Sequence, residues 1–393
     1  MSCIALYDEN SHLRAFDAQV IACTPARSGW AIALDQTAFF PEGGGTPADT
    51  GTLRDATGAA EVRVTDVQEC SGEILHFAGA PLTPGSRVHG EIDWARRFRH
   101  MQNHSGEHIV SGLIHTLYGL ENVGFHLGTE DVTIDLNGEL TRAQLDHIED
   151  LANDAVFRNL PVRTEYPSPE ALAAMFYRSK RALAGRVRIV TIGDVDCCAC
   201  CAPHVAQTGE IGAIKLLDFV RMRGGVRVHL RCGADAMADY REKYRNAAEI
   251  SALLSAKQNE TAQAVQQLWD ALQNEKREAA LLRRTLAEAR AAALPSGEAP
   301  LCLFESGDSD TLRMLVNAGV ARGARVCGVF CGSDASGYRY VLGSRRLDLR
   351  AAAPAFNARL HGRGGGSPEM IQGSVAAPRD EIQRVFLSFF AQI

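Results

Sequence analysis

The chain has 393 residues, of which 46% are hydrophobic and 22% charged, so wholesale disorder is excluded and two or three domains of ~100–200 residues are expected. The net charge of −6 excludes a protein that is basic over its whole surface and binds DNA through that charge. No run approaches the ~18 apolar residues of a bilayer span, and the N-terminus lacks a basic segment followed by an apolar one. We therefore expect a soluble, cytoplasmic protein with no membrane or DNA partner.

The first region, residues 1–93, is built from short alternating runs of apolar and polar residues. Residues 30–34 and 62–64 are examples, and Gly, Pro and Asp separate the runs from one another. Such runs are typical of short strands joined by turns. This region is therefore predicted to be a small β domain, barrel-like in form.

The second region, residues 94–233, mixes helical and strand patterns and is predicted to be an α+β domain. Apolar residues and histidines recur at steps of three and four as far as residue 118, which predicts a helix. A second helix is predicted after Thr141, where Thr-Arg-Ala-Gln forms a capping box. Strands are predicted within residues 131–136, 186–192 and 214–230.

The third region, residues 234–295, contains no Gly, and its only Pro is the terminal Pro295. Apolar residues between Val265 and Leu286 fit the a and d positions of a heptad, with Glu275 as the exception. We expect one long helix or a helical hairpin that ends at Pro295. It would serve for packing, for a homodimer, or as an arm that reaches a partner.

The fourth region, residues 296–393, is predicted to be an αβ unit. Strands are expected at residues 301–304 and 325–330, with a helix at 311–321 between them and a closing helix at 379–390. Six Arg and one acid, Asp348, lie between residues 336 and 363, and such a basic patch can contact phosphates. The chain as a whole is predicted to be α+β.

Two pairs of residues suggest a metal centre. His104 and His108 are four apart on the first predicted helix, so their imidazoles leave the same face and suit one Zn²⁺. About ninety residues later, Cys200 and His204 could complete a set of one thiolate and three imidazoles, for one zinc ion per chain. The chain has eleven cysteines, and three of them remain alternatives to Cys200: Cys197, Cys198 and Cys201.

The spacing of the two helical histidines also permits another interpretation. Residues 104–108 match the H-x-x-E-H pattern of inverted zinc proteases, with Glu107 as general base. That pattern requires a downstream Glu as third ligand and leaves the Cys200 and His204 pair without a role. A protease is therefore the third hypothesis for this chain.

Four motifs together resemble a known family. They are Thr-Ala-Phe-Phe-Pro-Glu-Gly-Gly-Gly at 37–45 with Ala-Asp-Thr-Gly at 48–51, the two histidines at 104 and 108, Cys-x-x-x-His-Val at 200–205, and Thr-Gly-Glu-Ile-Gly at 208–212. In this order they resemble the editing domain of alanyl-tRNA synthetases and its free-standing AlaX relatives. Residues 363–370 and 372–373 resemble the C-terminal DHHA1-type domain of those synthetases, so the resemblance covers nearly the entire chain, as in the long AlaX form.

The resemblance implies a trans-editing hydrolase that deacylates mischarged tRNA(Ala), chiefly Ser-tRNA(Ala), with Gly-tRNA(Ala) as a further candidate. Zinc would assist hydrolysis of the ester or only organise the pocket, because four protein ligands make a closed site. No Gly-x-x-x-x-Gly-Lys loop is present, so the chain is not expected to charge tRNA. The non-enzymatic alternative is a tRNA-binding module with a structural zinc.

The same resemblance suggests roles for further residues. A pocket group that hydrogen-bonds the serine hydroxyl would reject alanine, and the candidates for it are Thr37, Thr46 and His126, although a satisfied core histidine is an equal interpretation of His126. Glu42 and Glu107 are candidate proton carriers or ordinary carboxylates. Gly43, Gly44 and Gly45 would let the backbone approach the terminal adenosine or form an ordinary turn. The residues expected to contact the tRNA body are Arg345, Arg346, Arg363, Gly364, Gly365 and Gly366.

Two departures from the family pattern bear on specificity. Thr46 stands where the glycine-rich loop commonly ends in Gln, and residues 201–203 read Cys-Ala-Pro where synthetases usually have Gly-Gly-Thr. The expected metal ligands are unaffected by either change. Both changes bear on how the pocket discriminates between amino acids.

Overall fold

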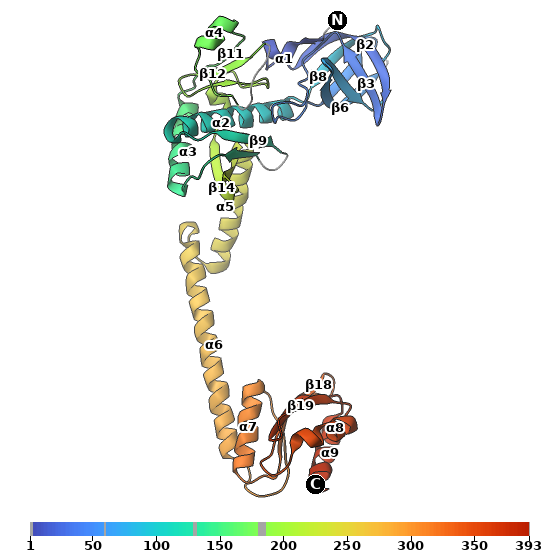
Figure 1. Cartoon of the computed structure of the whole chain (residues 1–393), viewed down its shortest axis with the longest axis vertical. Helices are drawn as coiled ribbons and strands as arrows, with labels where there is room; N and C mark the ends of the chain where they lie inside the picture. Colours follow the sequence, from blue (N-terminus) through green and yellow to red (C-terminus); the bar gives the residue numbers. More distant parts are fainter. Residues whose placement is uncertain (1–2, 59, 129–131, 180–185, 393) are drawn as a thin grey trace. The chain divides into compact units, whose positions relative to one another are not determined.

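The computed structural model describes residues 3–58, 60–128, 132–179 and 186–392 (Figure 1). The chain divides into two compact units, Met1–Ala248 and Glu249–Ile393, and each has its own hydrophobic core. Among the helices of the described residues, none has both the length and the apolar character that crossing a bilayer requires.

The first unit begins with a closed six-stranded barrel, whose strands follow one another around it in the order β2-β3-β7-β6-β5-β8. Buried and exposed residues alternate along the strands, and the buried side chains fill the interior of the barrel. In β8, for example, Val88 and Ile92 are buried, whereas Arg87, His89 and Glu91 are exposed. The strands are β2 (Ala15–Ala26), β3 (Gly29–Leu34), β5 (Gly51–Asp55), β6 (Glu61–Cys70), β7 (Glu73–Ala78) and β8 (Arg87–Ile92). The prediction of a small barrel-like β domain is confirmed.

A short N-terminal element precedes the barrel strands. Strand β1 (Ile4–Ala5) pairs in parallel with β4 (Gln36–Thr37), and the single turn of α1 (Leu6–Glu9) follows β1. Tyr7 of α1 is buried with its ring edge against Phe40, 5.4 Å between ring centroids. This contact fastens the N-terminal segment beside the glycine-rich loop that starts after Phe40.

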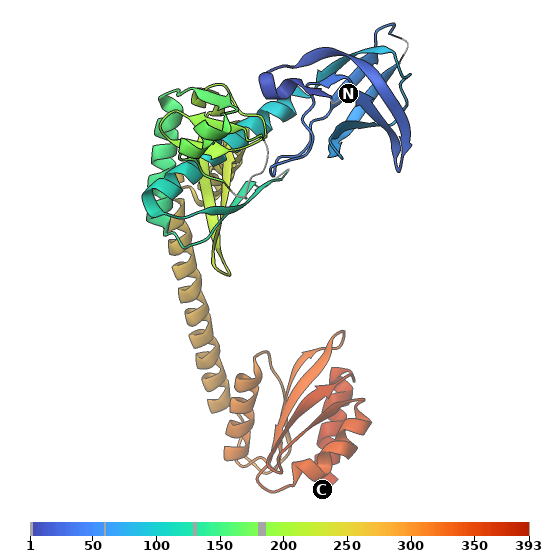
Figure 2. The same cartoon turned by 45° about the horizontal axis from the view of Figure 1, so that its top comes forward.

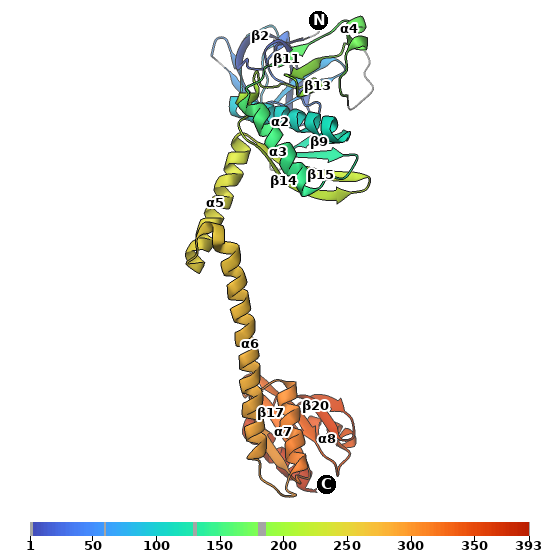
Figure 3. The ribbon, with the colours of Figure 1, turned by 90° about the vertical axis from the view of Figure 1, so that its left-hand side faces the viewer.

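Two helices pack on a four-stranded antiparallel sheet (Figure 3). Helix α2 (Trp94–Tyr118) ends at Gly119, whose φ of 65° is the left-handed conformation typical of a helix C-terminus. Helix α3 (Arg142–Phe157) begins at the predicted Thr141 capping box, which is present. The strands are β9 (Asn122–Leu127), β10 (Val132–Leu136), β14 (Ile214–Met222) and β15 (Gly225–Cys232), in the order β14-β15-β10-β9.

A separate three-stranded sheet carries the cysteine-rich segment. It consists of β11 (Val162–Glu165), β12 (Ile189–Ile192) and β13 (Asp196–Ala199), all antiparallel, with α4 (Pro169–Ala174) and the 3₁₀ turn η1 (Thr208–Ile211) nearby in the chain. The strand predicted at 186–192 thus starts at Ile189. Of the strand predicted at 131–136, residue 131 lies outside the described residues.

The helical region is interrupted, so the expectation of one continuous helix is wrong. Helix α5 (Ala234–Leu254) and helix α6 (Thr261–Ala292) are separated by a bend and the 3₁₀ turn η2 (Gln258–Glu260). Ser255 has a φ of 50°, and the Ser251 hydroxyl donates to the carbonyl of Ala256, which ends the helical hydrogen-bond pattern there. The hairpin alternative stays a prediction.

The second unit contains a five-stranded sheet with helices on both faces (Figure 2). Helix α7 (Ser309–Ala321) covers one face, and α8 (Leu349–Arg359) and α9 (Arg379–Gln392) cover the other with an aromatic core that includes Phe356 and Phe386. The strands, in sheet order, are β16 (Leu301–Phe304), β17 (Cys327–Ser333), β18 (Gly337–Gly343), β20 (Met370–Val375) and β19 (Arg363–Gly366). The predicted αβ unit is confirmed, whereas the domain boundaries drawn from the sequence stay predictions.

Candidate metal centre

Helix α2 places the two histidines four residues apart on one buried face. His104 and His108 are 1% and 3% exposed, and their ring centroids lie 5.0 Å apart. The helix is buried along the residues around them because it packs against α3, the four-stranded sheet and β13. Two imidazoles are therefore held in a region from which water is largely excluded.

The segment that follows β13 brings the second pair to the same place. The His204 ring lies 4.3 Å from the His104 ring and 4.6 Å from the His108 ring, between centroids. The Cys200 Sγ lies 3.5 Å from His104 Nε2. One donor atom from each of these four residues falls within 4.8 Å of all the others. The structure thus brings together the four residues that the sequence suggested as ligands.

The chemistry of the four donors fits a zinc ion. Burial raises the pKa of the Cys200 thiol, but the neighbouring imidazoles, His104 foremost, outweigh it and hold that pKa well below its usual value. The Nε2 atom of His204 is buried and has no hydrogen-bond partner within the described ranges. A thiolate with three imidazoles is a donor set that zinc prefers.

Two of the histidines are oriented from behind by further side chains. His204 Nδ1 lies 3.0 Å from Ser105 Oγ, and His108 Nδ1 donates to Asp196 Oδ2 over 3.0 Å. Such outer partners fix the ring orientation of metal-ligating histidines. Burial raises the pKa of Asp196, but its bonds to His108 and Arg178 outweigh this and lower it, so the carboxylate is charged.

A buried arginine shapes the loop that carries Cys200 and His204. Arg188 is 6% exposed, and its Nη1 donates to the carbonyls of Cys200 and Ala202 over 3.1 and 3.0 Å. Sequence reasoning missed Arg188, Arg178 and Asp196. The only signal was a charged residue next to an apolar strand, and that pattern by itself does not distinguish a buried side chain from a solvated one.

The glycine-rich loop lies beside the metal centre. Gly44 and Gly45 have φ values of 62° and 84°. A Cβ on Gly45 would lie 2.7 Å from the carbonyl oxygen of Phe125, and a Cβ on Gly44 would lie 3.5 Å from the Sγ of Cys201. The Phe125 ring in turn stacks on the His104 ring, 5.3 Å between centroids. The loop therefore packs against the strand that walls the centre, at a distance that only glycine permits.

The candidate pocket residues do not gather in one place. Thr46 is buried at the end of the glycine-rich loop, and its hydroxyl lacks a hydrogen-bond partner in the part of the chain that the structure describes. Thr37 is buried in the barrel domain, where its hydroxyl bonds His76 Nε2 over 2.8 Å and accepts from the Phe39 amide. His126 is exposed on β9 and faces away from His104, because its neighbour Phe125 points towards it.

The two candidate carboxylates are engaged elsewhere. Glu42 is exposed and accepts a bond from Gln68 on the barrel. Glu107 is buried on α2 and accepts bonds from Ser111 and Asn122. The metal-binding groups found among the described residues contain no Glu, which argues against the H-x-x-E-H protease arrangement.

The basic residues expected to contact tRNA fall at two ends of one sheet. Arg363 begins β19 opposite Ser374, and Arg339 of β18 faces the same serine from the other side. Both arginines and His361 line a polar cavity of about 530 Å³. Arg345 and Arg346 follow the opposite end of β18, where Arg346 bonds Glu298. Gly364, Gly365 and Gly366 form the exposed edge strand β19.

Comparison with known proteins shows which proteins this chain resembles. Residues 10–96 match the class II (A) tRNA synthetases, and residues 187–229, which include Cys200 and His204, match the second additional domain of threonyl and alanyl tRNA synthetases. The alanyl-tRNA editing protein AlaX-L of Pyrococcus horikoshii is 33% identical over 247 residues, 61% of each chain. The chain is therefore similar to alanyl-tRNA editing proteins.

The relatives of this chain differ in length. The alanyl-tRNA editing protein Aarsd1 of Mus musculus is 27% identical over 390 residues, 94% of this chain and 93% of its own length. An alanine–tRNA ligase of Pyrobaculum neutrophilum is 33% identical over 389 residues, which are 94% of this chain. The chain spans 32% to 42% of the length of this ligase and two other archaeal alanine–tRNA ligases that it matches.

Proposed function

We propose that this chain is an aminoacyl-tRNA deacylase that edits mischarged tRNA(Ala) in trans, with Ser-tRNA(Ala) as its chief substrate and Gly-tRNA(Ala) as a further one. The observation that carries the proposal is the convergence of His104, His108, Cys200 and His204 beside the glycine-rich loop. The near full-length relation to a protein named as an alanyl-tRNA editing protein supports it.

We assign the four converging residues as the ligands of one zinc ion per chain. Zinc bound there supplies Lewis-acid polarisation of an ester carbonyl. The chain's own groups do the rest: the Ser105 and Asp196 side chains orient two of the imidazoles, and Arg188 holds the loop between Cys200 and His204 in place. An aminoacyl ester is far more labile than an amide, so positioning in a site that excludes water supplies much of what catalysis needs.

Discrimination of serine from alanine is assigned to Thr46. Its hydroxyl is buried at the loop beside the centre and is unpaired within the described residues. A serine hydroxyl gives it a partner, whereas alanine leaves it unpaired at the cost of a buried, unsatisfied polar group. Gly44 and Gly45 bring the loop backbone close enough to the centre for the terminal nucleotide to be held between them.

The second unit is assigned as a DHHA1-like tRNA-binding domain. Arg339, His361 and Arg363 line one cavity and can meet phosphate oxygens, which is where most affinity for RNA backbone originates. The glycine-rich β19 offers an exposed edge without side chains that would hinder approach. The apolar residues of α6 that fit a heptad, such as Leu268 and Leu272, are half exposed, so a homodimer through this helix is part of the proposal.

The test is release of labelled serine from Ser-tRNA(Ala), with Ala-tRNA(Ala) in parallel. The expected result is rapid release of serine with alanine spared, and loss of release by about 10²-fold or more in Cys200→Ser and His104→Ala. Cys70→Ser and His147→Ala, which change exposed residues of the same types, are the matched controls.

One alternative is favoured by a specific observation. Four protein donors make a closed site, as in structural zinc sites. If zinc is bound and tRNA is retained but neither serine nor alanine is released, the chain is a tRNA-binding module with a structural zinc and the editing proposal fails.

A further inference from the structure

A second group of metal-ligating side chains lies directly behind the first. His108, Asp196 and Cys198 are all buried, and one donor atom from each lies within 4.8 Å of the others. His108 belongs to both groups. The question is therefore whether this second group is another metal site or a support for the first.

The contacts of Asp196 and Cys198 argue against a second metal ion at this group. Asp196 Oδ2 accepts from His108 Nδ1 over 3.0 Å, and Arg178 donates to both carboxylate oxygens, from Nε over 2.8 Å and from Nη2 over 3.0 Å. The guanidinium thus occupies the side of the carboxylate that a second cation would need. The Cys198 Sγ lies 3.6 Å from the carbonyl oxygen of Ala199, a hydrogen-bond contact within its own strand.

Arg178 is itself fixed to the strand that leads to the metal ligand Cys200. Its amide donates to the carbonyl of Cys197 over 2.8 Å, and its carbonyl accepts from the amide of Ala199 over 2.9 Å. Through these two bonds the backbone of Arg178 pairs in parallel with Cys198 of β13, as an isolated β-bridge. The side chain therefore reaches Asp196 from a backbone that cannot shift without moving β13.

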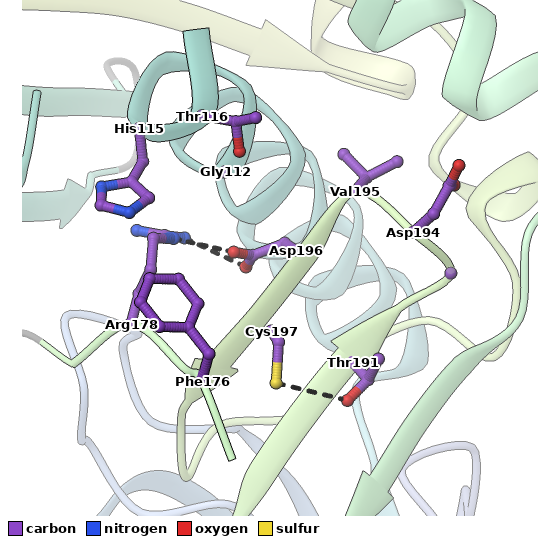
Figure 4. A pocket seen from close by; sticks show the side chains of 11 residues that line it. Gly112, His115, Thr116, Phe176, Arg178, Thr191, Asp194, Val195, Asp196 and Cys197 are labelled. Atoms are coloured by element: carbon purple, nitrogen blue, oxygen red, sulfur yellow. Dashed lines mark hydrogen bonds and ion pairs between the residues drawn. The ribbon is translucent and has the colours of Figure 1, made fainter. Parts of the chain in front are cut away.

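The opposite side of Asp196 is shaped by helix α2. A Cβ on Gly112, one turn after His108, would lie 2.8 Å from the Asp196 Cβ, so glycine leaves the room that Asp196 occupies. Figure 4 shows Arg178 pointing at Asp196, with His115 and Phe176 beside it. These residues line a cavity of about 190 Å³, and the ion pair stands between this cavity and His108.

We propose that Arg178 and Asp196 form a positioning pair that fixes the tautomer and ring orientation of His108, so that the chain binds one metal ion through His108 and not two. This inference rests on the zinc centre of the proposed function. The pair differs from the proposed ligands in that it touches neither metal nor substrate. Loss of such an outer partner typically costs about 10–100-fold in metal affinity or activity.

The test compares Asp196→Asn with Asp194→Asn. Asp194 lies two residues away, and its side chain is 69% exposed and pairs with Arg158 at the surface. The purified full-length proteins are assayed for zinc content, for the rate of zinc transfer to a chromogenic chelator, and for the absorption spectrum after Co²⁺ substitution. We expect one zinc per chain in the wild type, about 10–100-fold faster zinc release in Asp196→Asn with an altered Co²⁺ spectrum, and no change in Asp194→Asn.

Arg178→Lys is the second variant, in case Asp196→Asn does not fold. Lysine keeps the charge but lacks the planar fork that gives the carboxylate two parallel hydrogen bonds, so we expect faster zinc release than in the wild type but slower than in Arg178→Met. Two zinc ions per chain in the wild type would overturn the inference. The inference would also be overturned if the variants had a lower unfolding temperature, by the same amount with and without zinc, but an unchanged rate of zinc release and an unchanged Co²⁺ spectrum. The pair would then only hold β13 in place. A wild type that binds no zinc would refute the proposed centre itself.

Discussion

At the scale of single residues, Thr37 and Thr46 are two buried threonines, one at the start of the glycine-rich motif and one directly after its glycines, and their hydroxyls have opposite surroundings. The Thr37 hydroxyl is bonded to His76 and to the Phe39 amide, whereas the Thr46 hydroxyl is unpaired within the described residues. A buried polar group that lacks a partner in the free protein is available to a ligand, at no loss of an internal bond. The sequence offered both threonines as pocket candidates and does not distinguish their surroundings.

Replacement by valine should therefore separate the two roles. Thr46→Val is expected to leave stability unchanged or higher, and to lower the ratio of serine to alanine release by about 10–100-fold, because the serine hydroxyl loses its partner. Thr37→Val is expected to cost about 1–3 kcal/mol in unfolding free energy, because the buried Nε2 of His76 and the Phe39 amide lose their partner, and to keep the ratio. Urea unfolding and parallel deacylation assays measure both quantities. An unchanged ratio in Thr46→Val would remove Thr46 from the pocket.

At the scale of elements, the contact between the glycine-rich loop and β9 joins the barrel to the metal centre. The Gly45 carbonyl accepts from the Leu127 amide over 3.3 Å, and the Phe125 ring between them stacks on His104. The loop is thus fixed to the strand that walls the centre. A side chain added to the loop should disturb the site without changing any ligand.

Gly45→Ala and Gly58→Ala form a matched pair for this contact. Both positions have a positive φ, 84° and 73°, so both substitutions carry the same backbone strain of about 1 kcal/mol. Only at Gly45 would the new Cβ meet the Phe125 carbonyl, at 2.7 Å, whereas Gly58 faces open space. We expect a fall in kcat/KM of at least about 10-fold for Gly45→Ala alone, with zinc content unchanged. Equal effects of the two substitutions would show that strain, and not the contact, limits activity.

Local signals in the sequence predicted the elements better than the connections between them. The Thr141 capping box and the three- and four-residue periodicity of α2 depend on near neighbours, and both are present in the structure. The hairpin alternative allowed for a break, but its position after Leu254 was not predicted, because serine and alanine permit a helix and the left-handed Ser255 is visible only in the structure. The candidate site shows the same difference. The spacing of the histidines and of Cys200 pointed to four candidate ligands, which the structure brings together, whereas the contacts of Arg178, Asp196 and Arg188 join segments whose proximity the spacing does not predict.

At the scale of the whole molecule, the two units divide the proposed work. The first holds the metal centre, and the second holds the cavity lined by Arg339, His361 and Arg363. The net charge of −6 does not reveal this division, because the surplus of positive charge in the second unit is local: six Arg and one acid, Asp348, lie between residues 336 and 363. The basic patch was visible in the sequence, but its separation into two ends of a sheet depends on the register of β18, β19 and β20.

This division predicts how salt and substrate length affect the enzyme. Binding to a phosphate releases counterions, so removing one phosphate-binding side chain should reduce the slope of log affinity against log salt by about 0.7–0.9. The double variant Arg339→Gln/Arg363→Gln should therefore weaken binding of full-length tRNA(Ala) and flatten its salt dependence, while the kcat for release of serine stays the same. Arg322→Gln, a change of an exposed arginine after α7, is the control for net charge.

An assay with a minihelix, an RNA that contains only the acceptor stem, tests which part of the tRNA these arginines bind. If the cavity in the second unit binds the body of the tRNA, the double variant should deacylate a seryl-minihelix at the wild-type rate, because this substrate has no body for the two arginines to bind. An equal weakening for the minihelix and the full tRNA would place these arginines against the acceptor stem instead. Because the metal centre is formed entirely by residues of the first unit, zinc content should be the same in all three proteins.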